Sequence, residues 1–416
     1  MTTISLLKLS GGMPVVIETN PGVRSAALVW MIPAGVATDP PDHLGFSPLW
    51  SELLLRGAGE LGSRAQADAF DRVGAARSTR VSSRFLTLGM TVIGGRLSEA
   101  LPLLVDMVRR PRFDEASIAP SRELCLQAIE ALKDDPGERA ALGARARHLP
   151  PPFNRSTLGE SAGIAAITRD ELVERWRRLA VPGGSIMALA GAVEPGAVVE
   201  QLERLLAGWE GAAPEPVPAP TAPRGYAHEQ DKTNQVQIVL VHDAPAEPAA
   251  DSAVERLATS VLSGGMSSRL FTEVREKRGL CYSVHARYSA DRDFGVVTAD
   301  VGTQPERAQQ SLDVLVAELE RIRTPAGRVT PEEFHRAHVG MKSRLVFSGE
   351  STGSRAAALA GDMHRLGRPR TLDEIAAEIE AVTLDRLNAY VAARPLGRVT
   401  VQTVGPAPLV MPAQLA

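Results

Sequence analysis

Several features that mark specialised classes of protein are scarce in this sequence. Only two cysteines occur among 416 residues, Cys125 and Cys281, so the disulfide framework of a small secreted protein is excluded. Aromatic residues make up 4% of the chain, which argues against the stacking platforms that bind single-stranded nucleic acid. A net charge of −3 provides no general attraction to nucleic acid or to anionic membranes. We therefore expect two buried, reduced thiols and no nucleic-acid partner.

Long apolar runs are also missing. No uncharged stretch reaches the roughly 18 apolar residues that a membrane-spanning helix needs, so we expect no membrane span. The first residues, Met1–Pro21, lack the basic segment and apolar core of a secretory leader. We expect a cytoplasmic protein, or a periplasmic one if a leader has been removed.

The length of the chain and one proline-rich segment indicate two domains. A chain of 416 residues is long for a single core. Five prolines lie within Ala212–Arg224, and such a composition forms a stiff, extended linker without a core of its own. We predict an N-terminal domain over residues 1–211, a linker over 212–225 and a C-terminal domain over 226–416.

An internal repeat supports this division. Ile164–Leu172 resembles Ile379–Leu387 at an offset of 215 residues, and each copy precedes a helix, a Pro/Gly turn and a strand. The order of the preceding elements matches as well: strand, helix, helix, strand and two long helices. We therefore predict an α+β fold of two homologous halves, each a mostly antiparallel sheet covered by helices.

Hydrophobic periodicity places the individual elements of the first half. Asp134-Asp135-Pro136 is interpreted as a helix end, and residues 147–154 as irregular. Thr168–Glu171 has the pattern of a capping box. The remaining predictions are a buried strand over 25–32, a helix over 44–56 with Pro48 near its start, a helix over 63–73 with Ser63 as N-cap, a strand over 84–93, and helices over 97–108 and 118–132.

One stretch of the second half carries a dense pattern of charges and glycines. The pair Gly264-Gly265 predicts a turn, followed by a short helix over roughly 268–278 and a stop at Gly279. A strand with alternating side chains begins near Tyr282. Because the chain reverses at Gly279, we expect the Arg275 guanidinium and the Tyr282 phenol to lie close together.

This stretch, Gly-Gly-Met-Ser-Ser-Arg-Leu-Phe-x-Glu-Val-Arg-Glu-Lys-Arg-Gly-Leu-x-Tyr from Gly264 to Tyr282, resembles the pitrilysin and mitochondrial-processing-peptidase family of zinc metallopeptidases. Together with the order of elements, the resemblance covers nearly the whole chain. It implies an N-terminal half that in active members carries the inverted zinc motif His-x-x-Glu-His on a helix. A distant glutamate is the third ligand.

The sequence departs from that family pattern at the zinc site. The motif aligns with Gly45–Gly57, where Pro48, Ser51 and Glu52 replace the first histidine, the glutamate and the second histidine. Ala128 stands at the position of the third ligand. Because all three ligand positions and the base have changed together, we expect no metal on this chain.

Arg275 and Tyr282 match the arginine and tyrosine that the C-terminal half contributes to the family's active site. By that resemblance, the planar guanidinium would hold a substrate carbonyl or carboxylate, and the phenol would donate to the oxyanion of the tetrahedral intermediate. From spacing alone, an alternative stays open in which Arg275 is an exposed helix charge and Tyr282 a core aromatic.

The resemblance implies a non-catalytic subunit of a heterodimeric zinc metallopeptidase. A homologous sister subunit would carry the zinc, and this chain would close the chamber, bind an extended peptide and supply Arg275 and Tyr282. Processing of a precursor peptide is one activity that such a pair would have. Two alternatives remain: a purely structural or binding subunit of a larger complex, and a homodimer that has lost its activity.

Overall fold

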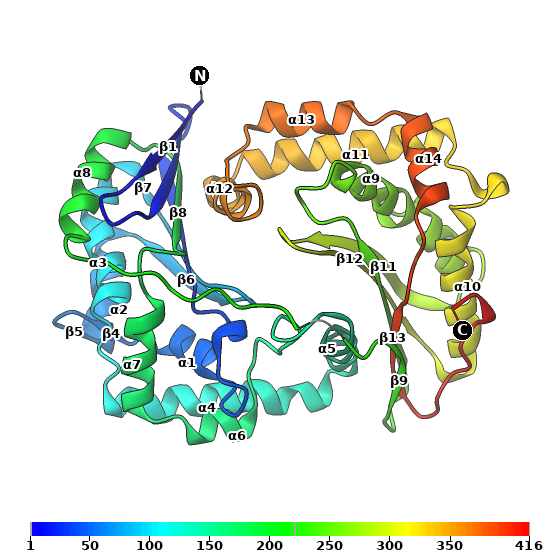
Figure 1. Ribbon diagram of the computed structural model, residues 1–416, viewed down its shortest axis with the longest axis horizontal. Coiled ribbons are helices and arrows are strands. Elements are labelled where there is room, and N and C mark those ends of the chain that lie inside the picture. Colours follow the sequence, from blue (N-terminus) through cyan, green and yellow to red (C-terminus); the bar gives the residue numbers. More distant parts are fainter. Residues whose placement is uncertain (1, 220–221, 416) are drawn as a thin grey trace. The chain divides into compact units, whose positions relative to one another are not determined.

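The computed structural model describes residues 2–219 and 222–415, which divide into two compact units (Figure 1). Unit 1 comprises Met1–Ala131, Pro151–Pro220 and Ser348–Arg370, and unit 2 comprises Leu132–Pro150, Thr221–Phe347 and Thr371–Ala416. The compact units therefore do not follow the expected boundaries at 1–211, 212–225 and 226–416. One segment of each half packs in the unit formed mainly by the other half.

A six-stranded sheet forms the centre of unit 1, in the order β1-β2-β8-β3-β7-β6. All neighbours are antiparallel except β2 and β8, which are parallel. The central strand β3 is buried on both faces and occupies the residues predicted for it. The strands are β1 (Thr3–Lys8), β2 (Pro14–Thr19), β3 (Ser25–Ile32), β6 (Ala76–Val81), β7 (Leu86–Ile93) and β8 (Ile186–Gly191), with a separate small hairpin of β4 (Gly57–Ala58) and β5 (Leu61–Gly62).

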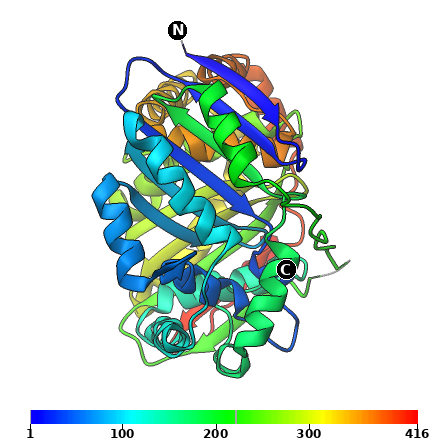
Figure 2. The same ribbon diagram turned by 90° about the vertical axis from the view of Figure 1, so that its left-hand side faces the viewer.

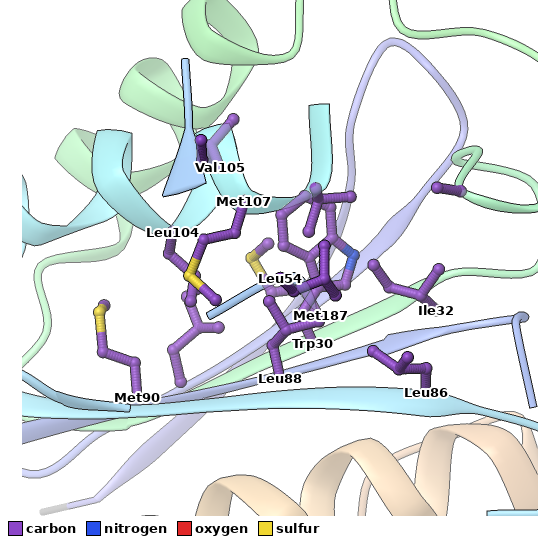
Figure 3. Close-up of a cluster of buried hydrophobic side chains, with 14 of the residues drawn as sticks. Trp30, Ile32, Leu54, Leu86, Leu88, Met90, Leu104, Val105, Met107 and Met187 are labelled. Carbon is purple, nitrogen blue, oxygen red and sulfur yellow. The ribbon is translucent and has the colours of Figure 1, made fainter. Parts of the chain in front are cut away.

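Helices cover both faces of this sheet, and Figure 2 looks onto the face that carries α2, α3 and α8. Between that face and the helices lies the main core, in which Leu104 and Met107 of α3 point toward Leu88 and Trp30 on the strands (Figure 3). The helices of unit 1 are α1 (Phe46–Leu53), α2 (Ser63–Val73), α3 (Leu97–Arg109), α4 (Glu115–Ala131), α6 (Ser161–Ala166), α7 (Arg169–Leu179), α8 (Pro195–Leu205) and α12 (Thr352–Leu366).

Unit 2 is built on a five-stranded sheet in the order β11-β12-β10-β13-β9, again with one parallel pair, β13 and β9. Its strands are β9 (Gly225–Gln230), β10 (Val236–Ala244), β11 (Cys281–Ala290), β12 (Gly295–Thr303) and β13 (Thr400–Gly405). Its helices are α5 (Pro136–His148), α9 (Ser252–Ser263), the π-helical segment η4 (Phe271–Glu276), α10 (Ala308–Arg321), α11 (Pro331–Gly349), α13 (Leu372–Glu380) and α14 (Leu384–Ala393).

The two sheets repeat one topology. In unit 1, β8 lies parallel to β2 and antiparallel to β3, while in unit 2 β13 lies parallel to β9 and antiparallel to β10. Even the register repeats, because Leu28 faces Leu189 in the first sheet and Leu240 faces Val401 in the second, 212 residues later. The α+β class with helix-covered sheets is confirmed.

Two equivalent helices, α12 and α5, are exchanged between the halves of the chain. Helix α12 covers the second face of the unit 1 sheet through Ala356, Leu359 and Ala360. Helix α5 covers the unit 2 sheet through Ala140 and Ala144, and β10 contributes Val239 and Val241 to that contact. Small alanine side chains on both helices let the helix approach the strands closely. This exchange explains why the compact units differ from the expected domains.

Helix α5 was not predicted from the sequence. The residues 134–136 do end one helical segment, but Pro136 also begins α5, and the side chain of Asp135 accepts a hydrogen bond from the amide of Glu138 as its N-cap. At α2 the N-cap is Gly62, so the prediction of Ser63 was wrong by one residue. The capping box at Thr168 and Glu171 is confirmed.

No helix within residues 2–219 and 222–415 has the length and hydropathy of a membrane span. Of the two cysteines, Cys125 is buried as expected, while Cys281 is half-buried.

The exchanged helix α12 carries a buried ion pair whose removal is expected to destabilise the protein. Arg355 donates to the Glu18 carboxylate of β2 at 2.7 Å, and both side chains are less than a tenth exposed. Arg355→Ala leaves Glu18 buried without a counter-charge, so we expect a loss of about 3–5 kcal/mol in the free energy of unfolding.

Urea unfolding measures this loss, and the double variant Glu18→Met/Arg355→Met is its control. Because an apolar pair needs no counter-charge, the double variant is expected to recover most of the stability. A double variant as unstable as Arg355→Ala would contradict this assignment to the uncompensated charge.

Candidate functional site

The segment after the glycine pair is helical, but its hydrogen bonds are wider than those of the predicted α-helix. Phe271–Glu276 forms a π-helical turn in which the amide of Lys277 donates to the carbonyl of Thr272. A π turn is rare and is found most often at functional sites. The prediction of a helix over roughly 268–278 was therefore right in place and wrong in type.

Gly279 ends this turn with a left-handed backbone, at a φ of 58°. This conformation favours glycine because a side chain would be strained there. The amide of Gly279 donates to the carbonyl of Arg275, and Arg307 donates to the carbonyl of Gly279. These contacts fix the point at which the chain turns from the helix into β11.

A β-bulge at the start of β11 turns Tyr282 out of the sheet. Cys281 pairs with Thr303 and Ser283 with Gly302, so Tyr282 has no partner residue on β12. Its side chain is 82% exposed, whereas Val284 is 4% exposed. The alternative in which Tyr282 is a core aromatic is therefore wrong.

The structure brings Arg275 and Tyr282 together. The guanidinium carbon of Arg275 lies 5.0 Å from the centroid of the Tyr282 ring and 4.7 Å from that of Phe271. Cation–π contacts of this kind orient a guanidinium without using its N–H donors. In the described part of the chain, no carboxylate pairs with Arg275 and no hydrogen-bond partner is found for the Tyr282 hydroxyl. Both groups keep their donors free.

Glu273, two residues before Arg275, is engaged elsewhere. Its carboxylate accepts from Lys277 and from Arg278, each at 2.7 Å. The hydrogen bond from Lys277 is the main cause that lowers the pKa of Glu273, and the bond from Arg278 adds to it. Glu273 is therefore an ionised partner of these two cations. The pairing of Glu273 with Lys277 agrees with the spacing in the sequence.

The positions Pro48, Ser51, Glu52 and Ala128 lie on two helices of unit 1 that pack against each other, α1 and α4. Cys125, one turn before Ala128, shows how close they come. Its thiol pKa is raised to about 11, first by burial and then by the charge of Glu52 on α1. The residues that align with the zinc motif and with the third ligand therefore lie on two helices that contact each other.

Family models for both halves match this chain. Residues 14–151 match the model described as Insulinase (Peptidase family M16), and residues 166–338 match that of the Peptidase M16 inactive domain. The chain belongs to peptidase family M16. This is the pitrilysin family, so the resemblance seen in the sequence is confirmed.

Relatives in M16 extend over nearly the whole chain. The uncharacterized zinc protease YmxG of Bacillus subtilis is 27% identical over 91% of this chain and 92% of its own. An uncharacterized zinc protease of Streptomyces coelicolor is 28% identical over 97% of this chain and 90% of its own.

Solved structures share the M16 fold. An M16 inactive domain from Pseudomonas fluorescens has a TM-score of 0.86 at 21% identity and covers 99% of both chains. A chain of complex III2 from Candida albicans has a TM-score of 0.84 at 15% identity and covers 97% of this chain and 96% of that one.

The residues that the sequence resemblance aligns with the zinc ligands of the family do not fit zinc. Zinc sites use thiolate, imidazole and carboxylate donors, and Pro48 and Ala128 supply none. The backbone carbonyl of Ser51 accepts from the Thr79 hydroxyl, and Glu52 lies 3.9 Å from Arg56. Across residues 2–219 and 222–415, no three His, Cys, Asp or Glu side chains gather closely enough to hold a metal ion.

A buried carboxylate, Asp39, holds the start of α1 in place. Its Oδ2 accepts from the amides of Gly45 and Phe46 at 2.8 and 3.1 Å, and its Oδ1 accepts from the Ser47 hydroxyl at 3.2 Å. Burial raises the pKa of Asp39 to about 6, while the bond from Gly45 acts in the opposite direction. This role of Asp39 could not be predicted from the sequence, because nothing local shows that its side chain would be enclosed.

This raised pKa predicts a pH dependence of stability. Because the folded pKa of about 6 exceeds the usual 3.8, Asp39 contributes stability that is complete below pH 3.8 and is lost as the pH rises through 6. We expect the stability difference between wild type and Asp39→Asn to favour wild type more at pH 4 than at pH 7, by up to about 3 kcal/mol. Urea unfolding at both pH values measures this difference, and equal differences would contradict it.

Proposed function

We propose that this chain is the non-catalytic subunit of a heterodimeric zinc metallopeptidase. In this proposal a homologous M16 subunit carries the metal and its base. This chain closes the chamber, binds the peptide in extended form and supplies Arg275 and Tyr282 to the partner's active site. The zinc of the partner subunit supplies the activated water.

One combination of observations supports this proposal most strongly. At the M16 metal position, Pro48, Ser51 and Ala128 replace groups that bind or activate a metal-bound water. On unit 2, the Arg275–Tyr282 pair keeps its geometry and its free donors, with Tyr282 82% exposed. Residues with only a structural role would more often be buried or paired. An exposed, preoriented and unpaired pair of donors favours a role in binding another molecule.

The geometry of the pair suits the chemistry of peptide hydrolysis. The planar guanidinium of Arg275 can hold a peptide carbonyl or carboxylate with two parallel hydrogen bonds. The Tyr282 hydroxyl, placed beside it by the bulge, can donate to the oxyanion that forms when the carbonyl is attacked. Phe271 and Tyr282 flank the guanidinium and limit the directions in which it can move.

A second candidate is a purely structural subunit of a larger complex. The observation that favours it is the shared fold with a chain of complex III2 from Candida albicans. A homodimer without activity is the third candidate.

Isolation of the native complex distinguishes the three candidate functions. A partner that contains His-x-x-Glu-His supports the peptidase subunit. A partner without this motif, or a second copy of this chain, contradicts the proposal.

The isolated chain is expected to bind no stoichiometric zinc and to hydrolyse no peptide. Its M16 metal position lacks suitable donors, so no activated water can form there. Metal analysis of the purified chain and a peptidase assay with and without chelator measure this. Chelator-sensitive hydrolysis by the isolated chain would overturn the proposal, provided that the preparation is free of other M16 subunits.

In the complex with its zinc-bearing partner, Arg275→Ala and Tyr282→Phe are expected to lower kcat/KM about 100-fold each. This is the range for loss of one donor to an oxyanion, roughly 3 kcal/mol. Steady-state kinetics measure the loss, and size-exclusion chromatography shows whether the complex still assembles.

Lys277→Ala is the matched control for these two variants. It removes a 60% exposed cation from the same turn, and the partner of that cation, Glu273, keeps Arg278. The control should retain the activity of the wild-type complex. Full activity in both Arg275→Ala and Tyr282→Phe would contradict the proposed role of the pair.

A further inference from the structure

A small polar cavity lies in unit 2 between α9, α11 and the glycine turn that joins α9 to η4. Its volume is about 70 Å³. This volume holds a few water molecules, or one small group such as a carboxylate. The residues that matter for its chemistry are Ser260, Gly264, Ser268, Glu333, Arg336 and Arg344.

The repeat of the chain relates this cavity to the pair of helices α1 and α4 in unit 1. Helix α9 follows β10 as α1 follows β3, so α9 is the counterpart of α1. Helices α4 and α11 begin at Glu115 and Pro331, an offset of 216, which carries Ala128 to Arg344. Arg344 lines the cavity. The cavity therefore lies between the two helices of unit 2 that correspond to α1 and α4.

The charges around the cavity favour an anion. Arg344 donates to the Ser260 hydroxyl at 3.1 Å and to the carbonyl of Gly264 at 3.4 Å, and has no carboxylate partner in the described ranges. The nearest acid to Arg336 is Glu332 at 4.0 Å, whose side chain is 88% exposed, so this pairing is weak. Two arginines thus lack a strong counter-charge.

The one acid in the cavity wall, Glu333, is already neutralised. Arg269 donates to both of its carboxylate oxygens at 2.7 Å, and the amide of Thr330 donates to it as well. The pKa of Glu333 is lowered; burial acts against this shift, and the hydrogen bond from Arg269 is its main cause. Glu333 is ionised but paired, so it does not cancel the charge of Arg336 and Arg344.

Glycines keep the cavity open. A Cβ added at Gly264 would lie 2.4 Å from the carbonyl oxygen of Ser260, which explains why only glycine fits at this turn. At Gly340 of α11, apart from its chain neighbours and the backbone of its own helix, the nearest described atom to an added Cβ is Nη1 of Arg344, at 3.5 Å. A side chain at residue 340 would therefore extend along the guanidinium and fill the cavity without displacing the backbone.

We infer that this cavity binds a carboxylate of the peptide substrate, at its C-terminus or on an acidic side chain. Free arginine donors and hydroxyls around a space of this size match a planar carboxylate, which accepts two parallel hydrogen bonds from one guanidinium. The inference rests on the proposed function, because it assigns one end of the peptide that the complex would cleave. It makes unit 2 a recognition site with two separate arginines, Arg275 and Arg344.

Isothermal titration of the isolated full chain at low salt tests the inference with four probes. These are N-acetyl-Gly-Gly, its C-terminal amide, N-acetyl-aspartic acid α-amide and inorganic phosphate. We expect at least one of the two carboxylates to bind, and N-acetyl-Gly-Gly amide to bind about tenfold more weakly or not at all. The two acids distinguish a C-terminal carboxylate from an acidic side chain.

Variants of the cavity locate the binding. Arg344→Gln removes a donor and Gly340→Leu fills the space with all charges kept, so each should weaken binding of the carboxylate about tenfold or more. Lys342→Gln is the matched control, because it removes an exposed cation of the same helix whose partner is Glu380, outside the cavity wall. It should bind as wild type does.

The inference is overturned if the acid and the amide bind equally, if neither acid binds, or if phosphate binds more tightly than both acids. Unchanged binding in both Arg344→Gln and Gly340→Leu would overturn it too. None of these titrations needs the zinc-bearing partner. Their failure would therefore remove the carboxylate site alone, whereas the kinetics of Arg275→Ala and Tyr282→Phe test the proposed function separately.

Discussion

The structure depends on the need of each sheet to cover two apolar faces. Strand β3 sends Trp30 to one face and Val29 to the other, so a layer of helices on one side alone would leave apolar surface in water. Helix α12, from the second half of the sequence, covers the second face of the unit 1 sheet. Helix α5, from the first half, covers the second face of the unit 2 sheet. Neither half of the sequence therefore contains all the elements of its own core, and the two halves must fold as one chain.

The parts that the sequence predicts well are those with a strong local pattern. Strand β3 and helix α3 have long apolar runs or stripes, and the capping box at Thr168 is a local motif. Helix α5 lacks such a pattern, because it contacts its sheet mainly through Ala140 and Ala144 and is otherwise rich in arginine. Its role is set by a sheet far away in the sequence, and no local signal reports that contact.

In the candidate site, too, some features follow from a local sequence pattern and others do not. Gly279 is a local signal for a reversal, which is enough to predict that Arg275 and Tyr282 meet. The bulge is set by the register of β11 against β12, so the outward direction of Tyr282 required the structure. On α1, the sequence shows that donors are missing but not what replaces them. The hydrogen bonds to Asp39 fix the start of this helix, and they could be found only in the structure.

The proposed function gives the two units different roles. A metal site needs several donors at fixed distances. Pro48 and Ala128, which align with two of the family's ligands, supply no donor. In unit 2, Arg344 lines the cavity between α9 and α11, where a guanidinium needs only space and an absent counter-charge to bind an anion. The segment from Gly264 to Tyr282 connects the cavity with the Arg275–Tyr282 pair, because it begins in the cavity wall and ends at the exposed phenol. In the proposed complex, this one short segment thus connects the two points at which the chain would hold a peptide.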